Sequence, residues 1–195
     1  MTEQRTAQNV EKREQTTSLR EKLMQVLPEG GLRENESMGR HTTFRAGGPA
    51  DYFAEPQSAD QLAGVIRVCR EAGEPYAIVG NGSNLLVGDL GYHGAVISIG
   101  KAFGEIRVED NRIFAGAGAL LASVARNALT AELTGFEFAA GIPGSVGGAV
   151  VMNAGAYGGE MKDIIEKVYV LDENGAQLEL DRDALDLGYR HSCIP

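Results

Sequence analysis

The 195-residue sequence has no tryptophan, only two cysteines and three histidines, and fewer basic than acidic residues. Its 18 Lys and Arg residues against 27 Asp and Glu residues give a formal net charge of -9, which argues against a basic surface for nucleic acid or an anionic membrane. No apolar run approaches the roughly 20 residues that cross a bilayer, and the N-terminus lacks the apolar segment of a signal peptide. An anionic ligand must therefore be held by backbone amides and a few arginines.

The scarce cysteines and histidines give no sign of metal or thiol chemistry. Cys69 and Cys193 are far apart and lack metal-ligand spacing, which favours a reduced, cytoplasmic setting. Cys69 falls on an apolar helical stripe and is expected to be a small core residue. Because His41, His93 and His191 are scattered along the chain, we expect no metal site.

Glycine is plentiful instead, with 26 residues. The stretch 139–160 holds seven glycines and almost no charge, yet it also contains Val146, Val150 and other apolar residues that need burial. Such density indicates positive φ angles or close backbone approach. We expect Pro143 in the first turn of a helix, with the amides of residues 144–147 free to bind an anion or a polar ring edge. A packing turn between two core elements explains the composition equally well.

Hydrophobic periodicity predicts alternating strands and helices. Residues 1–17 are expected to form a tail, followed by a capping box at Ser18–Glu21, a short amphipathic helix and a polar connector over 29–40. The β-α-β order that follows favours an α/β domain. The expected elements are two short strands around a break at 47–49, a capped helix from Ser58 to Gly73, strands 76–80, 85–87, 95–99, 105–108 and 112–115, a helix 120–133, strands 164–171 and 177–180, and a turn or short helix at 181–188.

The segment Gly80-Asn-Gly-Ser-Asn84 directly follows a predicted strand. Its consecutive N–H groups would form a nest suited to phosphate oxygens. It lacks the lysine of a Walker loop, and no helix of the dinucleotide-binding fold is expected after it. A plain hairpin turn accounts for the spacing equally well. Arg45, which precedes the glycines at 47–48, is either a surface arginine or a phosphate ligand.

Four segments in this order resemble one family: Thr43–Asp51, Val79–Leu86, Gly141–Glu160 and Tyr189–Ser192. Each motif alone is weak, but the ordered set is similar to that of the UDP-N-acetylenolpyruvoylglucosamine reductases (UDP-N-acetylmuramate dehydrogenases), flavoenzymes of bacterial peptidoglycan synthesis. The resemblance runs from about residue 39 to the end.

The resemblance implies an α+β fold, the two-lobed FAD-binding domain of the vanillyl-alcohol-oxidase or PCMH type. The implied division is a tail and amphipathic helix over 1–38, a first lobe over 39–94 and a second lobe over 95–195. The substrate-binding domain of the family would be absent from this chain.

The same resemblance implies FAD as cofactor, NADPH as hydride donor and a UDP-sugar as substrate. Because the loop 80–84 lacks the histidine that tethers flavin in some relatives, we expect FAD to bind non-covalently. The residues implied to contact FAD are Arg45, Gly80, Asn81, Gly82, Ser83, Asn84, Leu85, Gly141, Ile142, Pro143, Gly144, Ser145, Gly147 and Gly148.

Arg190 matches the catalytic arginine of the family, and Tyr189 is a substrate contact. In the implied chemistry NADPH reduces FAD, and a hydride then reaches the vinyl CH2 carbon of the substrate. The guanidinium would stabilise the charge that develops on the neighbouring carbon and its carboxylate, because it is planar and always protonated. Without the resemblance, Arg190 reads as a surface ion-pair partner of Asp183 or Asp186.

The family's proton-donating serine and enolate-stabilising glutamate lie in a later domain. Neither Ser145, Ser192 nor Glu160 matches them. We therefore expect a fragment of a longer enzyme, which binds FAD but turns over the sugar nucleotide poorly on its own. Two alternatives stay open: another sugar or lactone oxidoreductase of the same flavin fold, and a non-catalytic flavin-binding module.

Overall fold

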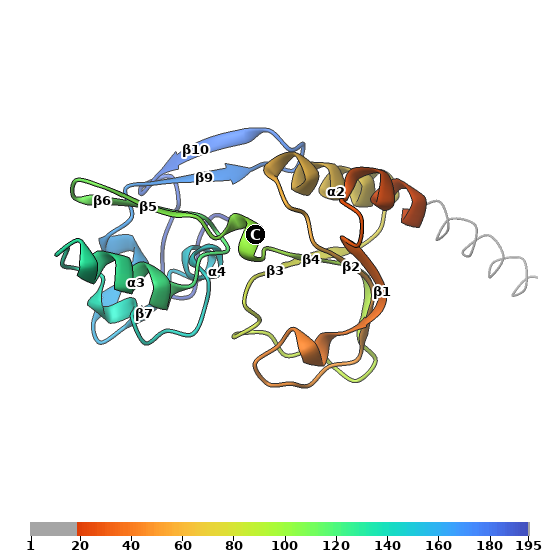
Figure 1. Cartoon of the computed structure of the whole chain (residues 1–195), viewed down its shortest axis with the longest axis horizontal. Helices are drawn as coiled ribbons and strands as arrows, with labels where there is room; N and C mark the ends of the chain where they lie inside the picture. The colour runs from red at the N-terminus through yellow and green to blue at the C-terminus, as the bar shows by residue number, and fades with distance from the viewer. Residues whose placement is uncertain (1–18, 195) are drawn as a thin grey trace, which may run out of the picture.

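The computed structural model describes residues 19–194, so the predicted tail and the Ser18 end of the predicted capping box lie outside the described residues. Figure 1 shows two lobes side by side, one built from strands β1–β4 with helix α2 and the other from α3, α4 and strands β5–β10. The two-lobed α+β architecture is the one that the family resemblance implies.

A four-stranded sheet of order β1-β2-β4-β3 forms the centre of the first lobe. Strand β1 (Leu32–Ser37) pairs antiparallel with β2 (Pro49–Ala54). Strand β4 (Tyr92–Ser98) pairs in parallel with both β2 and β3 (Tyr76–Val79). Parallel neighbours need a crossover connection, and helix α2 (Ala59–Glu71) supplies it between β2 and β3.

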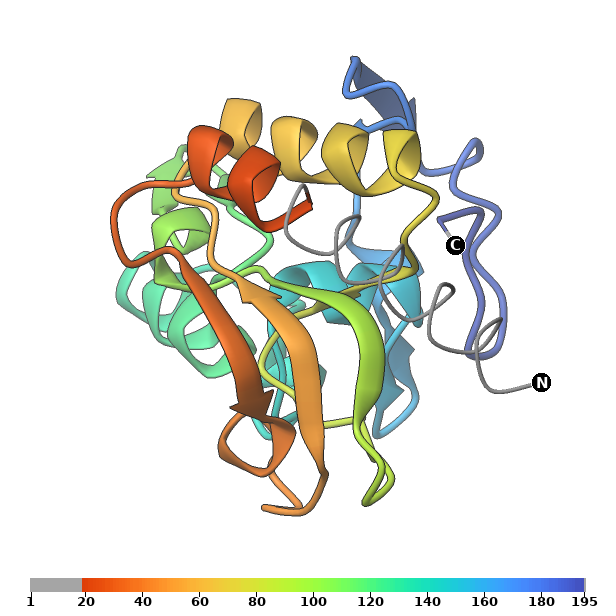
Figure 2. The same ribbon diagram turned by 90° about the vertical axis from the view of Figure 1, so that its right-hand side faces the viewer.

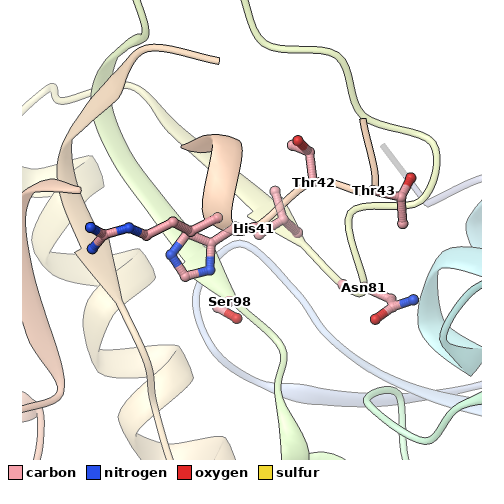
Figure 3. Close-up of a pocket in the computed structure, with 8 residues that line it drawn as sticks. His41, Thr42, Thr43, Asn81 and Ser98 are labelled. Carbon is pink, nitrogen blue, oxygen red and sulfur yellow. The ribbon is translucent and has the colours of Figure 1, made fainter. Parts of the chain in front are cut away.

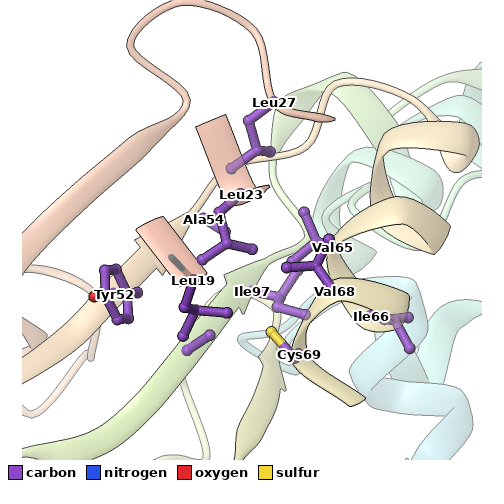
Figure 4. Packing of buried hydrophobic residues seen from close by; sticks show 11 residues of the cluster. Leu19, Leu23, Leu27, Tyr52, Ala54, Val65, Ile66, Val68, Cys69 and Ile97 are labelled. Carbon is purple, nitrogen blue, oxygen red and sulfur yellow. The ribbon is translucent and has the colours of Figure 1, made fainter. Parts of the chain in front are cut away.

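Helix α2 and the helical residues 19–26 lie along the same face of this sheet (Figure 2). As predicted, α2 begins at Ser58, whose Oγ accepts a hydrogen bond from Gln61 N at 3.2 Å, and Gly73 follows its end at a φ of 65°. Cys69 is fully buried there, as expected, and burial raises the pKa of its thiol to about 11. Figure 4 shows the apolar cluster between the helices and the sheet: Leu19, Leu23, Leu27, Tyr52, Ala54, Val65, Ile66, Val68, Cys69, Ala95 and Ile97.

Strands β2 and β4 carry apolar side chains on both faces. Tyr52 and Ile97 pack beneath the helices, whereas Phe53 and Val96 pack on the opposite face, as the two-residue period of a strand requires. Strands of this kind read as continuous apolar runs because both their faces are covered. The second face is closed by a smaller cluster: Met38, Ala50, Phe53, Val79 and Val96.

The chain before β2 differs from the prediction. Residues 29–40, predicted as a polar connector, contain β1 and the 3-10 turn Met38–Arg40. The sequence Leu-Arg-Glu-Asn-Glu-Ser carries only one apolar residue because β1 is an edge strand, so the apolar alternation that marks a strand is missing. The strand predicted in residues 41–46 is instead a loop.

The strand predicted at 85–87 is also a loop. Its apolar residues reflect burial rather than strand pairing, because Leu85 and Val87 pack against the smaller cluster. The first sheet thus runs from Leu32 to Ser98 and extends beyond the implied 39–94 lobe at both ends.

The second lobe consists of two-stranded ribbons and short helices. Its three ribbons pair antiparallel, and the hairpins predicted around residues 110 and 174 are confirmed. Within residues 19–194, no helix is long and apolar enough to cross a membrane. The elements are β5 (Ile106–Glu109), β6 (Arg112–Ala115), α3 (Leu121–Thr130), α4 (Val146–Val151), β7 (Gly155–Ala156), β8 (Gly159–Glu160), β9 (Lys167–Leu171) and β10 (Gln177–Asp181), with 3-10 turns at Lys101–Phe103, Glu137–Ala139 and Met161–Asp163.

The β9–β10 hairpin joins the two lobes. It extends from the second lobe to helix α2 of the first (Figure 1). At its tip, Glu173 Oε2 lies 2.7 Å from Arg70 Nη1, and a Cβ placed on Gly175 would lie 2.8 Å from the Cβ of Ala63. The hairpin therefore holds the second lobe against the helical layer of the first.

Candidate functional site

The loop of residues 80–84 leaves the carboxyl end of β3 and passes very close to two other segments. A Cβ placed on Gly80 would lie 2.3 Å from Ser145 Oγ. A Cβ on Gly82 would lie 1.9 Å from the carbonyl oxygen of His41, and Gly82 also has a φ of 64°. Any side chain at Gly82 would force the backbone apart, so this loop conformation requires glycine there.

The amides of this loop have no protein acceptor. Within the described part of the chain, the N–H groups of Asn81, Gly82, Ser83 and Asn84 donate no hydrogen bond to another protein group. Free consecutive amides in a tight loop suit the oxygens of an anion. This is the arrangement that the sequence predicts for phosphate binding.

The Gly-rich stretch after residue 139 forms its helix later than predicted. Helix α4 begins at Val146, with Ser145 as its N-cap, so Pro143 precedes the helix instead of occupying its first turn. After the proline, Gly144 and Ser145 lie between it and the helix, and Ser145 is extended and forms an isolated bridge with Leu120. Proline also fits this position, because it has no backbone N–H group that would need an acceptor.

Two of the four amides that were predicted to be free at this point are bonded. The amides of Val146 and Gly147 donate to carbonyls of the segment 117–119, both at 2.8 Å. The amides of Gly144 and Ser145 donate to no protein group within residues 19–194. The ligand-binding potential of the stretch therefore lies just before α4, in an extended segment, and not in the helix itself.

The two glycine-rich segments face each other. Gly80 lies against Ser145, as described above, and a Cβ placed on Gly144 would lie 3.5 Å from Ser83 Oγ. Segments about 60 positions apart in the sequence thus line one surface at the junction of the lobes. Their free amides lie along the same seam, which is the juxtaposition that the family resemblance implies.

The remaining predicted contacts of these two segments have different surroundings. Leu85 and Ile142 are half-buried, each packed on the apolar cluster of its own lobe. Gly141 and Pro143 are exposed, and a Cβ on Gly141 would meet nothing within 4 Å. Gly148 is exposed on α4, with Ser145 Oγ as its nearest side-chain atom.

Arg45 lies on a third loop that borders the same seam. Thr43 N donates a hydrogen bond to the carbonyl of Gly82 at 3.1 Å, which ties this loop to the residues 80–84. Arg45 has a φ of 53° and is exposed, and within residues 19–194 its guanidinium makes no ion pair or hydrogen bond. Its charge is therefore available to an anionic ligand.

His41 anchors this third loop to the sheet. Its ring stacks on Phe53 with centroids 4.0 Å apart, and its Nε2 lies 2.8 Å from Glu36 Oε1. This hydrogen bond lowers the pKa of the Glu36 carboxyl. Beside the ring, Figure 3 shows a cavity of about 240 Å³ lined by Arg40, His41, Thr42, Thr43, Val79, Gly80, Asn81 and Ser98.

Arg190 and Tyr189 form the tip of a tight turn. The guanidinium Nη2 of Arg190 donates to Asn84 Oδ1 at 3.1 Å, so the predicted catalytic arginine lies at the end of the predicted cofactor loop. Asp186, its expected partner in the alternative reading, instead lies 3.3 Å from His191 Nε2. Tyr189 is 94% exposed, and its ring is open to a ligand.

Asn153 is a structural residue of this site that sequence reasoning did not single out. It is buried at a φ of 41°, and its Nδ2 donates to Glu160 Oε2 at 2.7 Å and to the carbonyl of Gly188 at 3.1 Å. Its Oδ1 accepts from Lys162 N at 2.9 Å. Asparagine tolerates left-handed backbone better than most residues. A lone polar residue within an apolar, Gly-rich stretch was the available signal.

The donor set fits FAD. The pyrophosphate of FAD needs amide donors and positive charge, and the seam offers the free amides of residues 81–84, those of Gly144 and Ser145, and the guanidinium of Arg45. The absence of side chains at Gly80 and Gly82 lets Ser145 and the His41 carbonyl pack directly against this loop, which holds its backbone in place. No cluster of three or more His, Cys, Asp or Glu residues that could hold a metal occurs within residues 19–194.

Comparison with known proteins agrees with this class of site. The family model described as "FAD binding domain" matches residues 50–181, and the chain belongs to this family of FAD-binding domains. FAD is accordingly the cofactor of this domain, and the seam between the glycine-rich segments is its candidate site.

The chain is also similar to particular enzymes. It is 52% identical over 185 residues to the UDP-N-acetylenolpyruvoylglucosamine reductase of Agathobacter rectalis, covering 89% of this chain and 59% of that protein. The crystal structure of UDP-N-acetylenolpyruvylglucosamine reductase (MurB) from Thermus caldophilus matches 84% of this chain and 58% of its own, with a TM-score of 0.70 and 38% identity. p-Cresol methylhydroxylase shares the fold at a TM-score of 0.62 and 14% identity, over 85% of this chain and 35% of its own. The chain thus spans somewhat over half the length of the curated relatives that it matches.

Proposed function

We propose that this chain is the FAD-binding part of a UDP-N-acetylenolpyruvoylglucosamine reductase. The enzyme would use NADPH to reduce UDP-N-acetylenolpyruvoylglucosamine to UDP-N-acetylmuramate, in the cytoplasm and for peptidoglycan synthesis. The 52% identity to a reductase of this name supports the assignment. The observation that carries it is the contact of 3.1 Å between Arg190 Nη2 and Asn84 Oδ1, which joins the proposed catalytic residue to the proposed cofactor loop.

Bound FAD supplies hydride transfer, from NADPH and then to the vinyl CH2 carbon of the substrate. The role of Arg190 is electrostatic: its exposed guanidinium is a fixed positive charge for the enolate that forms at the adjacent carbon and its carboxylate. Tyr189, beside it on the same turn, is the proposed substrate contact. Arg45 and the free amides of the seam are the proposed FAD ligands.

The carbon next to the vinyl CH2 carbon must also receive a proton. Neither Ser192 nor Ser145 is suited to donate it. Ser192 is buried and donates its hydroxyl to the carbonyl of Val151 at 2.9 Å. Ser145 is buried against Gly80. We assign the proton donor, together with the substrate-binding domain, to the part of the relatives that this chain does not span. The proposed domain limits are 1–38, 39–94 and 95–195.

The test is NADPH oxidation by the complete, FAD-loaded protein. We expect consumption that depends on the enolpyruvyl sugar nucleotide, and an Arg190→Ala variant should be slower by roughly 100- to 1,000-fold in flavin reoxidation by that substrate. Arg190→Lys is the matched control that keeps the charge and loses the two-pronged donor geometry. Flavin reoxidation by oxygen with a free sugar as substrate would support another oxidoreductase, and bound flavin without any turnover would support a binding module.

A further inference from the structure

The side-chain amide of Asn84 links three segments that are far apart in the sequence. Its Oδ1 accepts from Arg190 Nη2 at 3.1 Å, and its Nδ2 donates to Met152 Sδ at 3.0 Å, at the end of α4. A guanidinium can only donate, so the oxygen of the amide must face Arg190. The nitrogen is then directed at the thioether, a weak acceptor that fixes the amide orientation without competing for Arg190.

The backbone of the turn that carries Arg190 is held independently. Gly188 and His191 exchange backbone hydrogen bonds of 3.1 and 3.2 Å, and Asn153 Nδ2 donates to the Gly188 carbonyl. Arg190 itself has a φ of 55°. These contacts fix where the side chain starts, but they do not fix the guanidinium at its far end.

The guanidinium has one side-chain partner. Within residues 19–194, Arg190 bonds to no side chain other than Asn84, because Asp186 pairs with His191. An arginine side chain has many rotamers, so an unrestrained guanidinium would lose conformational entropy when it is ordered during the reaction. An exposed hydrogen bond adds little to stability. The contact therefore matters for orientation.

We propose that Asn84 is a positioning residue, which orients the Arg190 guanidinium from the loop that holds the flavin pyrophosphate. This inference rests on the proposed function. Asn84 belongs to the loop whose amides are free for FAD, so the loop conformation that binds the cofactor also sets the arginine. A neutral amide accepts one hydrogen bond and leaves the positive charge available to the substrate, whereas a carboxylate would neutralise it.

The kinetic test compares the two half-reactions in the FAD-loaded, complete protein by stopped-flow absorbance. Asn84→Ala should slow flavin reoxidation by the enolpyruvyl sugar nucleotide by roughly 10- to 100-fold, the size of effect known for a misplaced catalytic group. Reduction by NADPH should change little, because Arg190 acts only after it. Leu86→Ala is the matched control: Leu86 lies just beyond the same loop with an exposed side chain, is not among the proposed FAD contacts, and has no polar group that could bond to Arg190.

A double-mutant cycle decides whether Asn84 acts through Arg190. In the Arg190→Ala background, Asn84→Ala should slow reoxidation by no more than about twofold, since its partner is already absent. Equal slowing in both backgrounds would overturn the proposal, as would an equal loss of reoxidation rate in Leu86→Ala. A wild-type protein that does not reduce the nucleotide at all would instead refute the proposed function.

A second readout needs no turnover. In nitrogen-15 NMR spectra of the FAD-loaded protein, the Arg190 guanidinium signal is assigned by its disappearance in Arg190→Lys. We expect this signal to shift and broaden in Asn84→Ala and to stay in place in Leu86→Ala. An unchanged guanidinium signal in Asn84→Ala would contradict the proposal even if the variant were slow. Visible absorbance before each measurement confirms that the variants retain flavin.

Discussion

The two lobes are held together in different ways. In the first lobe, eleven buried residues form one cluster between the helices and the sheet, and the central strands are covered on both faces. In the second lobe, the main cluster has five buried residues, and the apolar side chains around it are only partly buried. In the second lobe, the three hydrogen bonds of Asn153 supply part of the stabilisation that apolar packing supplies in the first lobe.

This difference explains where the site residues lie. The first lobe provides the loop of residues 80–84 at the carboxyl end of β3, together with the Arg45 loop that is bonded to it. The second lobe provides the Gly-rich segment and the Arg190 turn, which are fixed by backbone and amide contacts. Stability and ligand-binding groups are thus largely separated, and substitutions should distinguish the two.

The largest expected effect is at the loop. Gly82→Ala should abolish retention of FAD, because its Cβ would lie 1.9 Å from the His41 carbonyl and its φ of 64° is strained for alanine. The measurement is the flavin absorbance that stays with the protein after gel filtration. Gly88→Ala is the control, because a Cβ there meets nothing within 4 Å. Retained flavin in Gly82→Ala would show that the loop is not the cofactor cradle.

The next effect compares the two cores with the same substitution. Leu23 in the first lobe and Leu185 in the second are both fully buried. Leu23→Ala should lower the free energy of unfolding by about 4 kcal/mol and Leu185→Ala by about 2 to 3 kcal/mol, because the looser surroundings of Leu185 can collapse into the cavity. Urea denaturation of the apo protein measures both. The reverse order would contradict the contrast between the cores.

Asn153→Ala tests the polar support of the second lobe. It removes three hydrogen bonds and leaves Lys162 N without its side-chain acceptor. We expect a loss of about 2 kcal/mol in the free energy of unfolding, with weaker protection of the Arg190 turn in hydrogen exchange. Asn174→Ala, on an exposed turn, is the control. Equal losses of unfolding free energy in the two variants would show that Asn153 does not support the second lobe.

Glu36 gives the pH dependence of the first lobe. The hydrogen bond to His41 lowers the folded-state pKa of Glu36 below its ordinary value of 4.5. The resulting stabilisation is complete above that pH and is lost as the pH falls through the lower folded-state pKa. Glu36→Gln should therefore cost about 1 kcal/mol at neutral pH, and the difference from wild type should shrink in acid. A pH-independent difference would contradict this ionic origin.

The smallest effect is expected at the contact between the lobes. Arg70 and Glu173 form an exposed ion pair, so Arg70→Ala should lower the free energy of unfolding only slightly. High salt should remove most of that difference, because it screens exposed charges. Thermal unfolding at low and high salt measures it. A large, salt-independent loss would show that the hairpin depends on Arg70 for packing instead.

Much of the fold could be predicted because the signals are local. The cap at Ser58, the apolar stripe of α2 and the two polar turns of the hairpins each follow from residues within a few positions. Strand β1 could not be recognised, since an edge strand with one apolar residue lacks alternation. The segment 85–87 shows the opposite error. Its apolar run predicts a strand, but it is a loop in which Leu85 and Val87 pack on the smaller apolar cluster.

The site shows the same limit. Glycines, Arg45 and Arg190 could be selected from motifs and family resemblance, and their placement at one seam agrees with that selection. The contacts that organise them could not be predicted, because they join residues about 30 to 100 positions apart. The hydrogen bonds of Asn84 to Met152 and Arg190 depend on tertiary structure alone. The same is true of the hydrogen bonds from the amides of Val146 and Gly147 to carbonyls of the segment 117–119.

The most direct test of the flavin seam is the visible absorbance spectrum of the purified chain after mixing with FAD and removing the excess. The predicted result is an oxidised flavin spectrum that stays with the protein in roughly equal molar amount and disappears in Gly82→Ala. A chain that is folded by circular dichroism and retains no flavin would contradict the assignment of the two glycine-rich segments as the cofactor site.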